Sequence, residues 1–381
     1  MNSSLENVTE CSTRVSDSWI WALFFSTQSV ICITFIVFGL FGNTLSFVVL
    51  RRENPKTTTA LTLQALAVTD SVYLLCHFFF LSLMGIVKYV GTARHYVDVY
   101  GYLMLFVKPL MYISQQCSIW FVVLVTVDRF VVVCRPLKSG AFCTMTRARK
   151  HVIIVAILSL IYNMPRWFEL DLGFCYDVDL GHMRPINSDK EWMDADAYKY
   201  FYAMVLNSLV NFIAPMAILV FVNTSLILAL RKAGKRRHEL TGQGHPSKST
   251  TVMLVVVVLV FVACQTCDFV LQFLYFLDNE SVRSSDALFV YYMISSMMVV
   301  VNASTNFLIY CICGKKFRNL LLSLMAELCG RSLHRKKRSS KKPFAGQMTN
   351  SSQNVCKTPS LPSTGSQPNS SGSQLTHESV V

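Results

Sequence analysis

Long apolar stretches recur along the 381-residue chain and alternate with short polar segments. Each stretch can cross a bilayer as a helix, which takes about 20 residues. The polar segments between them carry charges that do not remain in hydrocarbon, so each stretch is a separate span. The pattern predicts an all-α membrane protein, a bundle of seven transmembrane helices. The expected spans are residues 24–50, 58–87, 100–133, 150–168, 199–231, 249–277 and 287–313.

Three further segments flank this transmembrane domain, which covers residues 24–313. Residues 1–23 form a polar N-terminal tail. Residues 314–330 combine an amphipathic pattern with basic residues, which predicts a short helix lying in the membrane interface. Residues 331–381 begin with a Lys/Arg cluster, expected to bind anionic lipid, and continue as a Ser/Thr/Asn/Gln/Pro-rich tail whose composition predicts disorder.

Composition agrees with a membrane location and excludes an ordinary soluble protein. The chain is 52% hydrophobic and 15% charged, and its mean hydropathy is +0.42. Its formal net charge of +13 comes from 35 Lys and Arg against 22 Asp and Glu. Basic residues gather in alternate polar segments, whereas the segment 166–196 is mostly acidic. The charge therefore predicts orientation, with the N-terminus outside the plasma membrane, and not nucleic-acid binding.

The first span is also expected to direct membrane insertion. Residues 1–18 lack the basic start and apolar core of a cleavable signal peptide.

A carboxylate in the second span, Asp70, marks a candidate functional site, because a charge at that depth needs partners. Two interpretations remain open. Oxygen ligands around one carboxylate suit a sodium ion or a protonation switch, and a plain hydrogen-bond network is the alternative. The candidate partners from other spans are Asn43, Ser118, Asn302 and Asn306.

A second polar group is expected nearer the outer face. Helical spacing places polar positions of spans three and six along one side of each helix. Asp268 can attract a cationic group of a ligand or pair with Lys108 across the bundle. Pro165 is expected to stop or kink span four, and after it Arg166 and Glu169 lie either in an interfacial belt or at the rim of a binding site. The candidates are Lys108, Tyr112, Gln115, Glu169, Gln265, Asp268 and Gln272.

The inner end of span three carries Asp128-Arg129-Phe130. These charges are either ordinary interfacial residues or a resting contact, in which Asp128 holds Arg129 until a cytoplasmic partner docks.

Several positions are candidate modification or docking sites. Asn2 and Asn7 begin glycosylation sequons in the outer tail. Cys11 and Cys175 can pair in an oxidising environment, although spacing alone does not establish it. Cys329 is a candidate palmitoylation site. The last four residues, 378–381, have the form of a ligand for PDZ-type strand-addition domains, and the serines and threonines before them can be phosphorylated.

Taken together, motifs in five spans resemble the rhodopsin-like (class A) G-protein-coupled receptors. They are Gly42-Asn43, Leu66-Ala67-Val68-Thr69-Asp70, Asp128-Arg129-Phe130, Pro215, Cys264 and Asn306-Phe307-Leu308-Ile309-Tyr310. Cys134-Arg135-Pro136-Leu137-Lys138, Asn163-Met164-Pro165-Arg166 and Cys264-Gln265-Thr266 further resemble the invertebrate FMRFamide-type neuropeptide receptors.

This resemblance implies a function. The ligand would be a short amidated peptide whose arginine seeks Asp268 or Glu169 and whose amide and phenylalanine lie among Tyr112, Gln115 and Gln265. Opening would free Arg129, with Asn306 and Tyr310 taking part, and admit a heterotrimeric G protein. A kinase and arrestin would act at the Ser/Thr tail.

Four positions depart from the family pattern, one of them Asn223 in span five, where many members have tyrosine. Met104 stands where the family has a cysteine bridged to the second outer loop. Cys267 and Phe307 stand where it has prolines in spans six and seven. Without those prolines the backbone hydrogen bonds are kept, and kinks are less expected.

Rival functions are weaker. A retinal receptor needs a lysine in span seven, and none occurs between Asp286 and Gly314. The internal repeats typical of transporters are absent. Membrane-enzyme motifs such as H-E-x-x-H are also absent, so the chain is not expected to be an enzyme. A chemoreceptor for a small non-peptide ligand is the remaining alternative.

Overall fold

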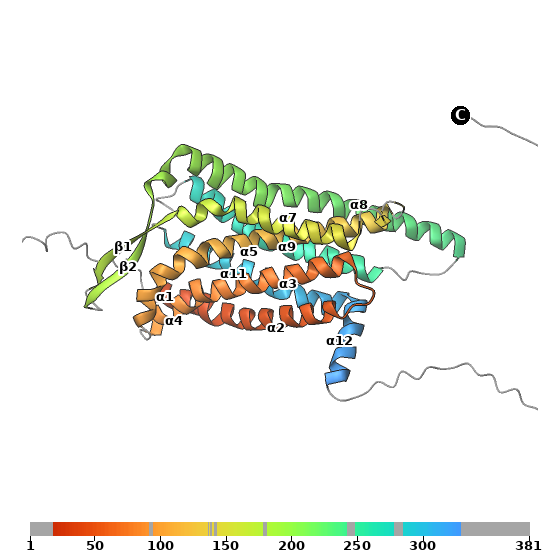
Figure 1. Cartoon of the computed structure of the whole chain (residues 1–381), viewed down its shortest axis with the longest axis horizontal. Coiled ribbons are helices and arrows are strands. Elements are labelled where there is room, and N and C mark those ends of the chain that lie inside the picture. Colours follow the sequence, from red (N-terminus) through yellow and green to blue (C-terminus); the bar gives the residue numbers. More distant parts are fainter. Residues whose placement is uncertain are drawn as a thin grey trace, which may run out of the picture. The chain divides into compact units, whose positions relative to one another are not determined.

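The computed structural model describes residues 18–90, 94–135, 137, 139–140, 143–177, 181–241, 248–277 and 285–328. Long helices run up and down side by side, and one β-hairpin extends from an end of the bundle (Figure 1). The spans are α1 (Ser18–Phe24) with η1 (Phe25–Ile31) and α2 (Cys32–Arg51); α3 (Thr58–His77) with η2 (Phe78–Ser82) and α4 (Leu83–Val90); α5 (Arg94–Cys134); α7 (Met145–Tyr162); η5 (Ala197–Leu206) with η6 (Leu209–Ile213) and α8 (Ala214–Thr241); α9 (Lys248–Leu277); and α11 (Asp286–Cys313).

These elements confirm the predicted seven-helix membrane bundle. Six of the spans are long and apolar enough to cross a membrane, and in α9 the described apolar stretch Val258–Leu274 supplies the seventh. The amphipathic helix predicted after the last span is α12 (Lys315–Leu328), which turns away from the bundle at the end opposite the hairpin (Figure 1). We call these ends the hairpin end and the α12 end.

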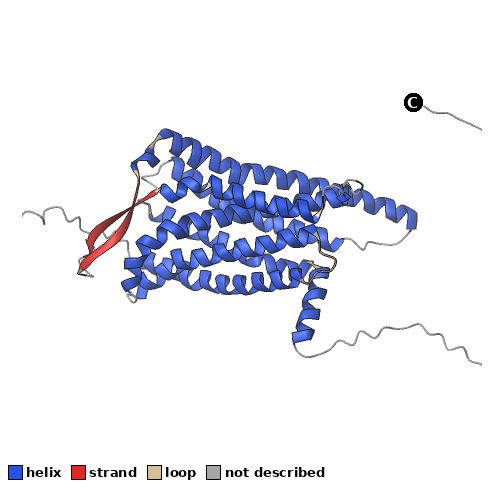
Figure 2. Cartoon of the chain, in the orientation of Figure 1, coloured by secondary structure: helices blue, strands red, loops and turns tan. Residues whose placement is uncertain are grey.

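The hairpin was not predicted from the sequence. Strand β1 (Leu170–Asp177) pairs antiparallel with β2 (His182–Asp189), and Gly181 takes the left-handed conformation at the turn with φ of 71°. Figure 2 shows it as the sheet beside the helices. Glycine, proline and several charges in this loop hide the period-two alternation that marks a strand.

The connection before the hairpin follows from proline chemistry. Helix α7 ends at Tyr162, as Pro165 predicts, and the chain continues as a 3₁₀ turn, η3 (Met164–Phe168). After the hairpin, η4 (Glu191–Asp194) leads into η5. This route brings the residues following α7 back over α5.

Close packing of α2 on α11 explains why two positions of α2 are glycine. A Cβ at Gly39 would lie 2.6 Å from the Ser304 hydroxyl, and one at Gly42 would lie 2.8 Å from the Cβ of Phe307. Phe307 occupies the place of the expected proline, so α11 continues unbroken through it. Its ring also meets Phe317 of α12 edge-on, at 6.0 Å between centroids.

We predict that Gly39→Val destabilises the bundle by about 1 to 3 kcal/mol, because the added carbons have no space beside Ser304. The measurement is the thermal unfolding midpoint of the detergent-solubilised protein. Gly140→Val is the matched control, since a Cβ at Gly140 meets no atom within 4 Å. Equal midpoints for the two variants would contradict the packing argument.

Candidate functional site

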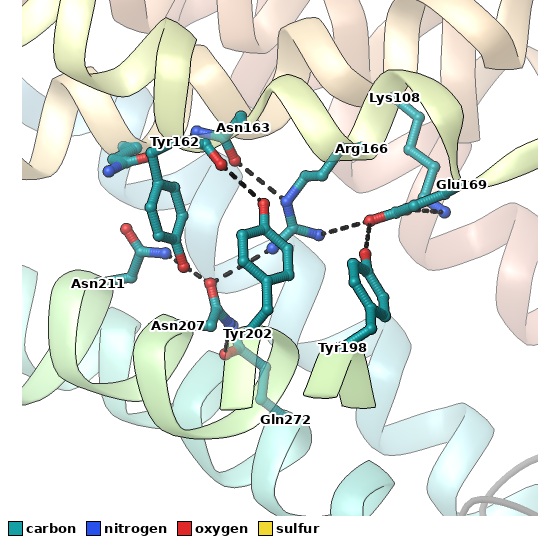
Figure 3. Close-up of polar contacts among 11 residues, drawn as sticks. Lys108, Tyr162, Asn163, Arg166, Glu169, Tyr198, Tyr202, Asn207, Asn211 and Gln272 are labelled. Atoms are coloured by element: carbon teal, nitrogen blue, oxygen red, sulfur yellow. Dashed lines mark hydrogen bonds and ion pairs between the residues drawn. The ribbon is translucent and has the colours of Figure 1, made fainter. Parts of the chain in front are cut away.

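A continuous set of polar side chains lies inside the hairpin end of the bundle, and we call it the polar cluster. Figure 3 shows the part of it around Arg166, Glu169 and Asn207. It joins α5, η3, the span formed by η5 and α8, and α9, which are far apart in the sequence. Its main members are Lys108, Tyr112, Gln115, Asn163, Arg166, Glu169, Tyr198, Asn207, Asp268 and Gln272.

Glu169 is the most enclosed charge of the cluster, with 2% of its surface exposed. One carboxylate oxygen lies 3.2 Å from the Lys108 ammonium, and the other lies 3.7 Å from the Arg166 guanidinium. The Tyr198 hydroxyl donates a further hydrogen bond to it. A buried carboxylate needs such compensation, so this anion is already neutralised within the protein.

Arg166 is held on several sides. Its Nε donates to Asn163 Oδ1 at 3.0 Å, and a terminal nitrogen donates to Asn207 Oδ1 at 3.3 Å. The guanidinium carbon lies 3.9 Å above the centre of the Tyr112 ring, within cation–π range. Arg166 is therefore enclosed by polar and aromatic partners, and its place at the rim of a binding site stays a prediction.

Asp268 differs from Glu169 because its hydrogen-bond partners are neutral. Gln272 Nε2 donates to its carboxylate at 2.9 Å, and Gln115 Nε2 donates at 3.4 Å. Among the described residues, Asp268 forms no ion pair with a lysine, arginine or histidine. The pairing of Asp268 with Lys108, one of two possibilities raised by the sequence, is not formed, because Lys108 binds Glu169.

The cluster encloses a cavity of about 20 Å³, bordered by Tyr112, Gln115, Asn207 and Asp268. That volume holds about one water molecule, so a larger ligand would require side chains to move.

Six of the seven predicted ligand residues lie in the polar cluster. Gln265 is buried one turn before Asp268 on α9. The sequence missed the contributions of Gln116, which accepts a hydrogen bond from Asn163, and of Tyr198 and Tyr202. The two tyrosines stand four residues apart at the start of a span, and that spacing was the available signal.

Asp70 lies in a second, deeper network with 1% exposure. Ser118 Oγ donates to one carboxylate oxygen at 2.6 Å, and Asn306 Nδ2 donates to the other at 2.7 Å. Asn43 instead donates to the backbone carbonyl of Ala303 at 3.1 Å. Asn302 is buried on the same helix without a hydrogen bond to Asp70. Two of the four predicted partners therefore bind Asp70 directly.

Near the α12 end, Asp128 binds the start of α3. Its carboxylate accepts hydrogen bonds from Thr58 Oγ1 at 2.8 Å and from Thr59 Oγ1 at 2.6 Å. The position also favours an anion, because α3 begins there with its positive dipole end. Burial and the neighbouring Asp128 carboxylate raise the pKa of the Cys143 thiol to about 11, so this thiol stays protonated at neutral pH.

Arg129 is half-buried and lines a cavity of about 150 Å³ together with Glu53, Tyr310 and Lys316. The expected resting ion pair between Asp128 and Arg129 is not formed among the described residues, and the threonines of α3 take its place. Phe130 is half-buried beside them. Tyr310 is buried and meets Phe317 at 5.6 Å between ring centroids.

Several predicted sites lie outside the described residues. They are Asn2, Asn7, Cys11, Cys329, the Ser/Thr tail and the C-terminal four residues. Cys175 is buried and disulfide-bonded. Because Cys11 lies outside the described residues, the pairing of the two cysteines stays a prediction.

Comparisons with known proteins agree with this architecture. A family model described as 7 transmembrane receptor (rhodopsin family) matches residues 42–310. An FMRFamide receptor of Drosophila melanogaster is 31% identical over 299 residues, which are 75% of this chain and 51% of that protein. The FMRFamide peptide receptor frpr-18 of Caenorhabditis elegans is 26% identical over 80% of this chain and 71% of its own length. The sex peptide receptor of Drosophila melanogaster is 23% identical over 81% and 74%.

The chain thus spans about half the length of the first of these relatives and about three quarters of the other two. The resemblance to FMRFamide-type receptors expected from the motifs is confirmed. The family match covers most of the helical bundle, and the chain belongs to the rhodopsin family of seven-transmembrane receptors.

Proposed function

We propose that the protein is a plasma-membrane receptor that binds a short amidated peptide outside the cell and activates a heterotrimeric G protein. Two relatives carry FMRFamide in their names, and both align with about three quarters or more of this chain. The observation that carries the proposal is Asp268, a carboxylate inside the bundle that accepts hydrogen bonds from two neutral amides and forms no ion pair within 4 Å among the described residues. A basic group of a peptide is the natural partner for such a charge.

The hairpin end faces outward in this proposal. Basic residues concentrate at the opposite end, in the connection after α2 and at the start of α12, where the positive-inside rule expects them. They include Arg51, Arg52, Lys56, Lys315, Lys316 and Arg318.

Binding would act through differential affinity. A peptide whose arginine pairs with Asp268 would take the place of the amide donors Gln115 and Gln272, which also connect α9 to α5 and to Asn207. It shifts the receptor toward an active state only if that state binds the peptide better. The rearrangement would then pass along α5 and α9 to the cavity at Arg129, where the G protein docks.

A screen tests the proposal as a whole. Cells that express the full chain are exposed to amidated peptides ending in Arg-Phe-amide, and intracellular calcium and cAMP are recorded. A response to such a peptide, absent in untransfected cells, is expected. Silence to all peptides together with a response to an amine or a volatile compound would favour a small-molecule chemoreceptor.

The proposal predicts that the peptide arginine contacts Asp268 and not Glu169. Replacing that arginine by uncharged citrulline should lower potency about 10- to 100-fold, the value of a charge-assisted hydrogen bond. With Asp268→Asn the same replacement should cost little, because the charge it met is gone. With Glu169→Gln the citrulline penalty should persist, since Lys108 and Arg166 already neutralise Glu169. Equal penalties in parent and Asp268→Asn receptor would rule out this contact.

The threonine contacts of Asp128 give a second prediction. We expect Asp128→Asn to raise basal nucleotide exchange several-fold, because it weakens the hold of α5 on α3. Thr59→Val should act in the same direction, and Thr59→Ser, which keeps the hydroxyl, should not. Arg129→Ala should reach the cell surface and lose agonist-driven exchange. If Thr59→Val leaves basal exchange at the parent value while Asp128→Asn raises it, the threonine is not part of the resting contact.

Sodium binding at Asp70 is part of the proposal. Asp70 with Ser118 supplies oxygen ligands, although Asn306 now donates to one carboxylate oxygen and would have to move. Replacing sodium by a large organic cation should then change agonist affinity in the parent receptor and have no effect in Asp70→Asn. An equal effect in both receptors would assign the ion to another site.

A further inference from the structure

A cavity of about 450 Å³ lies between the β-hairpin and the neighbouring turns of α4 and α5, and we call it the hairpin cavity. Its volume is within the range of about 300 to 1,000 Å³ that is typical of ligand sites. It is separate from the small cavity at Asp268. The wall residues that matter are Lys88, Met104, Lys108, Leu170, Arg184 and Asp189.

The cavity has a defined shape because the hairpin is fixed against α5. Gly101 lets β2 approach closely, since a Cβ there would lie 3.0 Å from the Cβ of Pro185. Asn187 Nδ2 donates to the Gly101 carbonyl at 3.0 Å, and His182 lies 2.9 Å from Asp98. Met104, one turn beyond Gly101, faces the cavity. These contacts hold β2 against α5 without a covalent bond, since Met104 cannot form a disulfide.

The charge of the cavity walls is opposite to that of the surrounding loop. The segment 166–196 is mostly acidic, yet the cavity is lined by three cations, Lys88, Lys108 and Arg184, and by the single anion Asp189. Lys88, Arg184 and Asp189 also make other contacts, so the inference rests on the sum of the charges. A concave surface with an excess of one sign concentrates ligand groups of the other sign.

Lys108 links this cavity to the polar cluster. It lines the hairpin cavity and also pairs with Glu169, which binds Arg166 as well. Because two cations share that one carboxylate, the three side chains together keep a net positive charge. Next to it, Arg166 stacks on Tyr112, which borders the small cavity at Asp268. A positive cavity and a negative carboxylate therefore stand at the two ends of one connected set of side chains.

We propose that the hairpin cavity binds an acidic side chain of the peptide whose basic group pairs with Asp268. The proposal deepens the proposed function and rests on it. If the amidated end of the peptide lies deepest, the acidic residue precedes the Arg-Phe-amide end. Leu170 and Met104 provide an apolar wall for its methylene groups, and the cations receive its carboxylate.

The test compares two matched peptides, Asp-Phe-Met-Arg-Phe-amide and Asn-Phe-Met-Arg-Phe-amide, on cells that express the full chain. The two differ by one charge at the predicted position. We expect the aspartate peptide to be about tenfold more potent in calcium or cAMP responses. Lys88→Gln with Arg184→Gln should reduce this preference to about twofold or less, whereas Lys88→Arg should preserve it.

The outcomes separate the two proposals. Equal potency of the peptides on the parent receptor overturns the hairpin-cavity proposal and leaves the peptide receptor intact. Failure of both peptides to activate counts against the proposed peptide ligand, and the cavity is then judged by a measurement that needs no agonist.

That measurement uses cysteine reporters. Val97 lines the cavity, and Val99, on the same helix, is exposed and does not. The rates at which Val97→Cys reacts with an anionic and with a cationic methanethiosulfonate are measured after subtraction of the parent rates. Adding Lys88→Gln and Arg184→Gln should lower the anionic-to-cationic ratio about fivefold at Val97→Cys and much less at Val99→Cys. Equal changes of this ratio at both positions overturn the proposal, because the electrostatic potential in the cavity would then be no more positive than at the nearby surface.

Discussion

The balance of charge inside the bundle is the constraint on which the hairpin end depends. Glu169 is almost fully buried, and it is tolerated because Lys108, Arg166 and Tyr198 surround it. This arrangement depends on the route of the chain after α7, since η3 must return over α5 to bring Glu169 to Lys108. It also leaves Asp268 with amide partners, and so decides which carboxylate is available to a cationic ligand.

Three carboxylates deeper in the helical spans follow a related rule. Asp70 and Asp128, like Asp268, accept hydrogen bonds from neutral hydroxyl or amide groups in the described residues. Such partners satisfy the charge without neutralising it, so a cation or a moving side chain can compete for it. In a receptor, this gives three places along α5 and its neighbours where a small rearrangement changes the electrostatic balance.

Departures from the family pattern are compensated locally. Phe307 replaces a proline, and its ring fits against Gly42 and Phe317, so that α11 stays continuous where a kink is usual. Cys267 likewise leaves α9 unbroken, and its carbonyl also accepts a hydrogen bond from Tyr291 at 3.0 Å. Met104 stands where the family has a cysteine of α5 that binds the hairpin; Cys175 of the hairpin is disulfide-bonded to another cysteine, and close approach at Gly101 with the Asn187 hydrogen bond holds β2 against α5.

The sequence alone determined the seven spans, the end of α7 before Pro165, the helix after span seven and most members of the polar cluster, because hydrophobic length, helical period and proline chemistry are local properties. It did not determine the hairpin or the pairing of charges. Glu169 and Asp268 looked equivalent as anions, and only the folded bundle placed Lys108 beside the first and amides beside the second. Likewise, Asp128 stands next to Arg129 in the sequence but binds Thr58 and Thr59, because helix rotation and the packing of α3 on α5 decide which donors reach a carboxylate.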